Sequence, residues 1–304
     1  MTTYALHKEF VGSTKLTSLP DLHSAALAGD SSKVEQYLSQ GLNVNISGEN
    51  YGTPLHAAAF NGDIMTAQLL INKGANINAL GTTHYGSPLQ TAAMAGNDAI
   101  VSLLLAEGAH INAPGTENYG TPLQSAARFG HLTIVELLLQ KGVDPNSPEQ
   151  SPQGTALHAA ALNGHKCEEF GIPLQAAASH ENEEIALTLT ELLLAKGANI
   201  KAKGCGAGSA LIAAVIYEHE KVVQLLLNSG ADVNATGGEY GSPLCASAIC
   251  EQVSIAQLLR QNEAEIDKRL EEIGVAAEYT NWNKDEDVEQ FLRTYGSAWI
   301  ALQE

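Results

Sequence analysis

The sequence is poor in aromatic residues, in cysteine and in positive charge. Aromatic side chains make up only 5% of the 304 residues, although 44% of the chain is hydrophobic. The apolar residues are therefore mostly alanine and larger aliphatic residues, which pack helices closely, rather than rings that fill a globular core. Charged residues make up 16%, which is too few for a disordered chain with this much apolar surface. The composition indicates a folded protein.

Cysteine and long apolar runs are equally scarce. No apolar run of about 18 residues is present, so no transmembrane helix is predicted. The first ten residues lack the apolar stretch of a secretory signal. We therefore expect an intracellular protein, in the cytoplasm or the nucleus, with no membrane association. The four cysteines follow neither metal-site nor disulfide spacing: Cys167, Cys205, Cys245 and Cys250.

Positive charge is outnumbered two to one. Lys and Arg total 16 against 34 Asp and Glu, a formal net charge of −18 at pH 7. Binding to nucleic acid is driven largely by counterion release when basic side chains neutralise phosphates. The charge balance, together with the absence of any Lys/Arg run, argues against a nucleic-acid partner.

One short segment recurs along the chain. Thr53-Pro54-Leu55-His56-Ala57-Ala58-Ala59 returns as Ser87-Pro88-Leu89-Gln90-Thr91-Ala92-Ala93, and again from Thr121, in steps of 34 residues. Self-similarity at a fixed period is the signature of a repeat architecture. Further copies start at Thr155, Ile172, Ser209 and Ser242, and a degenerate first copy starts at Leu22.

Each unit reads as two helices. Thr53 is suited to cap the first helix, and Pro54 to occupy its first position, where a missing N–H costs nothing. Gly62 supplies the left-handed stop. A second helix carries the aliphatic run around Leu70 and ends at Gly74. One such pair buries too little apolar surface to stand alone, so we expect the pairs to stack.

These motifs resemble the ankyrin repeat. The resemblance rests on Thr-Pro-Leu-His-x-Ala-Ala and on Gly230-Ala231-Asp232-Val233-Asn234-Ala235, and it covers roughly residues 20 to 268. It implies an all-α solenoid of about seven to eight helix-turn-helix units. Copies with Tyr-Gly-Thr-Pro-Leu-Gln are similar to those of filamentous fungi.

The chain departs from that pattern in three places. The 34-residue period exceeds the family's usual 33, which predicts one extra residue in the connecting finger. The 155–209 junction is too long for one unit and too short for two, and its second helix, Glu183 to Leu194, is about four residues too long. A kink, an extended helix pair and an unusual splice product all fit. Residues 1–20 are expected to form an N-terminal extension, 21–268 the solenoid, and 269–304 a helical, acidic and aromatic C-terminal cap.

The resemblance places binding on the concave side, formed by the fingers and the first helices. The two residues before each first-helix glycine form an unusually apolar row, which marks either an interaction site or internal packing. The finger tyrosines are either rigid anchors or a stacked ladder, and their regularity favours stacking. The predicted binding residues are Tyr51, Phe60, Tyr85, Met94, Tyr119, Arg128, Phe129, Leu162, His180, Ile216, Tyr217, Tyr240 and Ile249.

The leading hypothesis is a non-catalytic module that binds a protein partner in this groove. The acidic surface favours a partner with a basic edge. The expected hot spots are Phe60, Met94, Phe129, Leu162, Tyr217 and Ile249. No cofactor or metal is expected, since no phosphate-binding loop, nucleophile elbow or zinc motif is present.

The alternative is a groove that holds a small apolar ligand, or that serves as the active site of a cofactor-free cyclase or isomerase. Arg128 would then orient a carboxylate, or it pairs with a neighbouring glutamate instead. His180 and His219 each lie beside glutamate, which suits acid–base work, although a solvated charged turn is favoured. The resemblance assigns His56 and His158 to loop bridging, and we expect His131 and His165 to pack between units. The sequence leans away from an enzyme.

Overall fold

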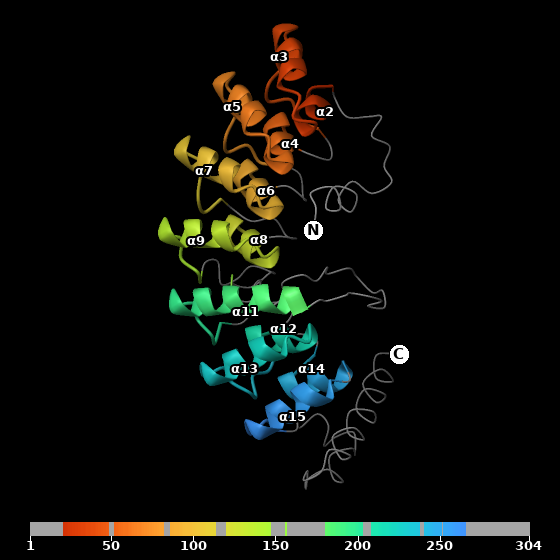
Figure 1. Ribbon diagram of the computed structural model, residues 1–304, viewed down its shortest axis with the longest axis vertical. Coiled ribbons are helices and arrows are strands. Elements are labelled where there is room, and N and C mark those ends of the chain that lie inside the picture. The colour runs from red at the N-terminus through yellow and green to blue at the C-terminus, as the bar shows by residue number, and fades with distance from the viewer. Residues whose placement is uncertain are drawn as a thin grey trace. The chain divides into compact units, whose positions relative to one another are not determined.

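The computed structural model describes residues 21–48, 52–81, 86–113, 120–146, 156, 180–202, 208–237, 240–250 and 252–265. Within these ranges the chain is helical, with one isolated antiparallel bridge between Gly48 and Gly52. The chain divides into two compact units, residues 1–144 and 145–304. The fold is the expected all-α repeat solenoid (Figure 1).

The first unit is a stack of helix pairs. The first helices α2, α4, α6 and α8 pack on one another in succession, and the second helices α3, α5, α7 and α9 form a parallel row. The pairs are α2 (Asp21–Leu27) with α3 (Ser31–Ser39), α4 (Pro54–Asn61) with α5 (Ile64–Asn72), α6 (Pro88–Ala95) with α7 (Asp98–Ala106), and α8 (Pro122–Arg128) with α9 (Leu132–Gln140).

The second unit continues the same pattern. In it, α12 packs against α14, and α11, α13 and α15 form the second row. Helix α11 has 16 residues where α13 has nine, so the overlong helix expected at the irregular junction is present. The helices are α11 (His180–Ala195), α12 (Ala210–Ile216), α13 (Glu220–Asn228), α14 (Pro243–Ile249) and α15 (Val253–Gln261).

The helix boundaries follow from local chemistry. Thr53 caps α4, where the Thr53 N–H donates to His56 Nδ1 at 3.0 Å. Gly62 then ends α4 with φ 88°, a left-handed conformation that glycine adopts without steric cost. Asp63 begins α5 by accepting from the Thr66 N–H at 2.6 Å.

The core lies between the two rows of helices. It consists of alanines and one leucine from each first helix, and of aliphatic residues from each second helix. The first-helix leucines of the first unit are at most 1% exposed: Leu22, Leu55, Leu89 and Leu123. Burial of each such side chain contributes roughly 1.5–3 kcal/mol.

Side chains of the first helices tie each repeat to the next finger. His23 Nε2 lies 2.9 Å from the Gly52 carbonyl oxygen, and His56 Nε2 lies 3.1 Å from that of Gly86. Gln90 donates in the same way to Gly120. The loop-bridging role expected of His56 is confirmed, and His158 lies outside the described residues.

A second ladder runs along the turns between the two helices of each repeat. Asn97 Nδ2 donates to the carbonyl oxygens of Ala59 and Phe60 at 2.7 and 3.0 Å. His131 Nε2 lies 3.0 Å from the Met94 oxygen. His131 therefore contacts the preceding repeat as expected, and His165 lies outside the described residues.

A third ladder links the asparagine tails. Asn45 donates to the Gly74 oxygen at 3.1 Å and accepts from the Asn76 N–H at 2.7 Å. The same pair of hydrogen bonds joins Asn78 to Gly108 and His110. In the second unit it joins Asn146 to Gly197 and Asn199. Each asparagine therefore joins two repeats.

Among the described residues, a backbone hydrogen bond between two glycines closes each of the first two fingers. The Gly48 N–H donates to the Gly52 oxygen at 2.6 Å, a separation of four residues, whereas Gly81 donates to Gly86, a separation of five. The extra residue of the first 34-residue step therefore lies inside the finger, as expected.

Candidate binding surface

The predicted apolar row is not a continuous exposed strip. Phe60 and Met94 are each only 2% exposed, because α4 packs between α2 and α6, and α6 packs between α4 and α8. Their side chains belong to the core between successive first helices. They offer almost no surface to a partner, and the expectation that they act as exposed hot spots is wrong.

At the end of α8, the two residues of the predicted apolar row differ in exposure. Arg128 is 8% exposed and takes part in interactions within the chain, so it is not a free cation awaiting a carboxylate. Phe129 is half-buried directly before Gly130, which has φ 77°. Phe129 is therefore an accessible member of the predicted surface in the first unit.

The second unit retains accessible apolar side chains at equivalent positions. Ile216 is the last residue of α12, Tyr217 is its C-cap, and Ile249 is the last residue of α14; all three are half-buried. The two helices pack against each other, so these side chains lie at neighbouring helix ends. Tyr240 is half-buried in the finger before α14.

Other predicted binding residues cannot be placed on this surface. His180 is the first residue of α11. The remaining ones lie outside the described residues: Tyr51, Tyr85, Tyr119 and Leu162.

His219 is buried, although its neighbours are exposed. It is 3% exposed and stands directly before α13, the position that His131 holds before α9. Glu218 and Glu220 on either side are exposed. The expectation of a solvated turn is therefore correct for the two carboxylates and wrong for the His219 imidazole. His219 occupies the position from which His131 contacts the preceding repeat.

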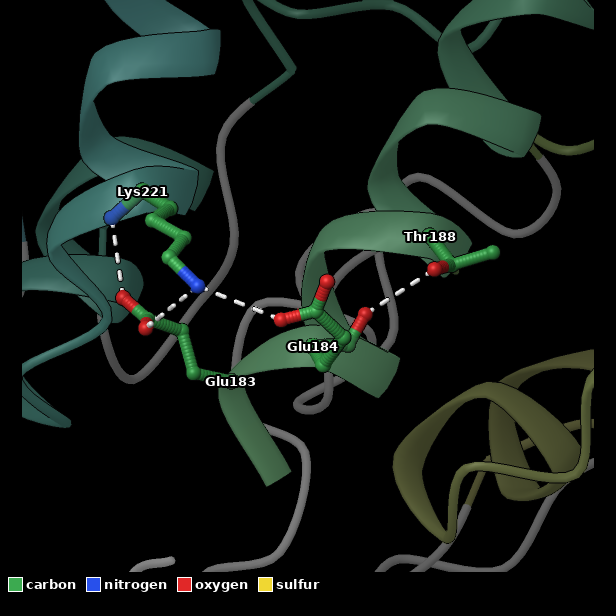
Figure 2. A network of polar contacts seen from close by, with 4 residues as sticks. All are labelled: Glu183, Glu184, Thr188 and Lys221. Atoms are coloured by element: carbon green, nitrogen blue, oxygen red, sulfur yellow. Dashed lines mark hydrogen bonds and ion pairs between the residues drawn. The ribbon is translucent and has the colours of Figure 1, made fainter. Parts of the chain in front are cut away.

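A polar network joins α11 to α13 (Figure 2). The Lys221 N–H donates to Glu183 Oε1 at 2.9 Å, and Lys221 Nζ donates to Glu184 Oε2 at 3.1 Å. The hydrogen bond to Glu184 raises the pKa of the Lys221 ammonium, and the negative charges of Glu184 and Glu183 add to this. The Lys221 ammonium is committed to α11, so it does not neutralise the neighbouring carboxylates Glu218 and Glu220.

A pocket of about 280 Å³ lies between the helix–helix turns of the last two described repeats. Its lining is Glu218, Glu220, Gln252, Ser254 and Ile255. This acidic and polar lining differs from the apolar lining expected of a site for a small apolar ligand.

Gln252 is the unusual member of this pocket. It is 7% exposed, and neither its side-chain nitrogen nor its side-chain oxygen has a hydrogen-bond partner. Neither Gln252 nor Ser254 was among the site residues predicted from the sequence. A usable signal was present, since Glu218 stands where other repeats carry the helix-ending glycine, for example Gly62 and Gly96.

Burial shifts the titration of several groups. Desolvation lowers the pKa of His56 to about 4, and it also lowers the pKa of His23 and of His131. Burial, and then the negative charge of Glu218, raises the pKa of the Cys250 thiol to about 11.

The described ranges contain neither a cluster of metal ligands nor a membrane-spanning helix. No group of three or more His, Cys, Asp or Glu side chains there is arranged to hold a metal ion. None of the helices in the same ranges has the length and apolarity needed to cross a membrane.

Stacked helix pairs, joined by side-chain ladders and closed by short fingers, define a helical repeat protein. The family model described as ankyrin repeats (3 copies) matches residues 22–115, 80–149, 114–170 and 174–270. These matches span well over half of the chain, which therefore belongs to the ankyrin-repeat family.

A solved structure supports the same assignment. The crystal structure of the human ASB11 ankyrin repeat domain is similar to this chain with a TM-score of 0.61 and 26% sequence identity. The similarity covers 82% of this chain and 100% of that one. No curated protein matches the chain by sequence. Ankyrin repeats are in general modules of protein–protein interaction.

Proposed function

We propose that this protein binds a protein partner along the concave side of its repeats, at the ends of the first helices. The observation that carries the proposal is the group of half-buried apolar side chains Ile216, Tyr217 and Ile249 at the C-terminal ends of the adjacent helices α12 and α14. Half-buried aromatic and aliphatic residues on rigid helices lose little conformational entropy on binding, which suits them as anchors.

The partner is expected to carry a basic edge. The formal net charge of −18 creates a negative potential that attracts positive charge and speeds encounter. Around the surface, Glu218 and Glu220 are exposed, and Lys221 is engaged by Glu183 and Glu184. Rising ionic strength should slow association because it screens these exposed charges.

The test is affinity capture with the full chain, followed by affinity measurement with each purified partner. The double variant Tyr217→Ser with Ile249→Ser should weaken binding by about tenfold or more. The matched control is Met65→Ser with Leu80→Ser, which alters side chains that are 69% and 70% exposed elsewhere. An unchanged affinity for the first variant, with its melting temperature intact, contradicts the proposal.

A further inference from the structure

The helix–helix turns of the second unit carry carboxylates at positions that favour glycine. Glu218 has φ 60°, whereas the residues that end the first helices of the first unit are glycines with φ between 68° and 88°. In the sequence, Glu251 occupies the same place one repeat later. A left-handed conformation is strained for glutamate, and strained positions concentrate at functional sites.

Two carboxylates and an amide without a hydrogen-bond partner line this pocket. Glu218 follows α12, Glu220 begins α13, and Gln252 precedes α15. Burial of an amide without a hydrogen-bond partner is costly, and a ligand that supplies the missing bonds removes that cost. Gln252 is therefore an observation independent of the two carboxylates, and its unpaired side-chain oxygen is suited to a ligand with hydrogen-bond donors.

The electrostatic balance selects a cation. The N-termini of α13 and α15 each carry roughly half a positive charge, and the two carboxylates exceed that sum by about one negative charge. Lys221 does not neutralise them, because Glu183 and Glu184 bind it. The pocket therefore remains negative without a ligand.

The shape selects a long side chain. A volume of about 280 Å³ holds one side chain rather than a helix. The two carboxylates and the amide oxygen of Gln252 supply acceptors for the head group of that side chain. A guanidinium has five N–H donors in a planar fork and pairs with several oxygen acceptors at once, whereas an ammonium is a compact, strongly hydrated point charge.

We propose that Glu218, Glu220 and Gln252 form a binding site for the guanidinium group of an arginine side chain on a partner protein. The inference rests on the proposed function, because it assigns one contact of the same interaction. The guanidinium donates to both carboxylates and to Gln252 Oε1, and Ser254 borders the site.

The probe is Nα-acetyl-argininamide, titrated into the full-length protein at low ionic strength and followed by NMR. We expect saturable shifts at the Gln252 side-chain amide and at the backbone amides of residues 217–220 and 252–255. The citrulline analogue, which is nearly isosteric but neutral, should bind about tenfold or more weakly. Equal binding of the two compounds, or shifts spread evenly over the acidic residues of the chain, overturns the proposal.

The chain offers a closely matched pair of variants. Glu218→Gly and Glu263→Gly each remove one negative charge, and each restores glycine where φ is positive, 60° and 65° respectively. Both should raise the melting temperature, so loss of folding cannot explain the result. Glu218→Gly should weaken arginine binding by about tenfold, and Glu263→Gly by less than about twofold. Equal effects of the two variants overturn the site.

Gln252→Leu separates the amide from the carboxylates. It replaces a buried, unpaired amide with an apolar group of similar size, which the fold should tolerate. We expect weaker arginine binding with the melting temperature retained, and unaltered binding contradicts a role for Gln252. If a partner protein binds Glu218→Gly normally but fails to bind the Tyr217 and Ile249 double variant, the arginine site is wrong and the proposed function stands.

Discussion

At the scale of single residues, His56 couples the stability of the repeats to pH. Nδ1 accepts from the Thr53 N–H, so Nε2 carries the proton and donates to the Gly86 oxygen. Protonation of Nδ1 would break the first bond and charge a side chain that is 1% exposed. This is why burial lowers the pKa to about 4.

The sign of the pH effect follows from linkage. Between pH 6.5 and about 4 the unfolded chain binds a proton at His56 and the native chain does not, so stability rises with pH. The contribution is complete above pH 6.5 and is lost as the pH falls toward 4, in total about 3 kcal/mol. The lowered pKa values of His23 and His131 act in the same direction.

His56→Gln should reduce this acid sensitivity. Gln90 holds the same position in the next repeat and bridges to Gly120, so an amide can keep the inter-repeat bond without titrating. The loss of unfolding free energy between pH 7 and pH 5, measured by urea denaturation, should be smaller by about 1–2 kcal/mol. His110→Gln, at an exposed position, is the control, and an undiminished loss in His56→Gln contradicts this account.

Some residue roles are set by short local motifs, and others by packing between helices that are distant in the sequence. The roles of His56 and His131 were predictable because each belongs to a short motif repeated at fixed spacing. The burial of Phe60 and Met94 was not, because it depends on how closely α4 and α6 approach their neighbours. The arginine pocket was also missed, since two turns 34 residues apart, at Glu218 and Gln252, have to be brought together.

At the scale of the element, the asparagines of the tails connect successive repeats, and the tail after α11 lacks the connecting asparagine. Asn45, Asn78 and Asn146 each accept one backbone N–H and donate to one carbonyl of the following repeat. Lys201 occupies this place after α11. Its ammonium has donors but no acceptor, so it cannot make both bonds. The repeat of α11 and the next repeat therefore lack this pair of hydrogen bonds, which we call the asparagine clamp.

Lys201→Asn should restore that clamp. By the spacing of the other ladders, the new amide would donate to the Gly230 oxygen and accept from the Asp232 N–H. We expect the unfolding free energy to rise by about 1 kcal/mol and the melting temperature by roughly 2–4 °C. Lys196→Asn changes the same charge at an exposed position, and an equal gain from that control would mean that charge rather than the ladder is responsible.

Helix positions were predictable because their signals are local. Ser or Thr followed by Pro begins α4, α6, α8 and α14, and left-handed glycine ends α4 and α6. The start of α11 was less certain, because its unit combines a repeat motif with four additional residues. Length alone could not decide whether those residues extended the helix or the loop.

At the scale of the whole molecule, the division into two compact units predicts more than one unfolding step. In a repeat stack each helix pair contacts mainly its neighbours, so stability is a sum of local terms. Residues 1–144 and 145–304 are each dense in internal contacts. A defect placed deep in one unit should therefore leave the other largely unaffected.

Leu104→Ala tests this independence in the full chain. Leu104 is fully buried on α7, and its truncation should cost roughly 2–5 kcal/mol. Hydrogen exchange should then accelerate in α4 to α9, while protection in α11 to α15 is retained. Leu80→Ala, at a side chain that is 70% exposed, should change neither. Equal loss of protection in both units would mean that they unfold as one body, and a partner bound to the second unit would then stabilise the first as well.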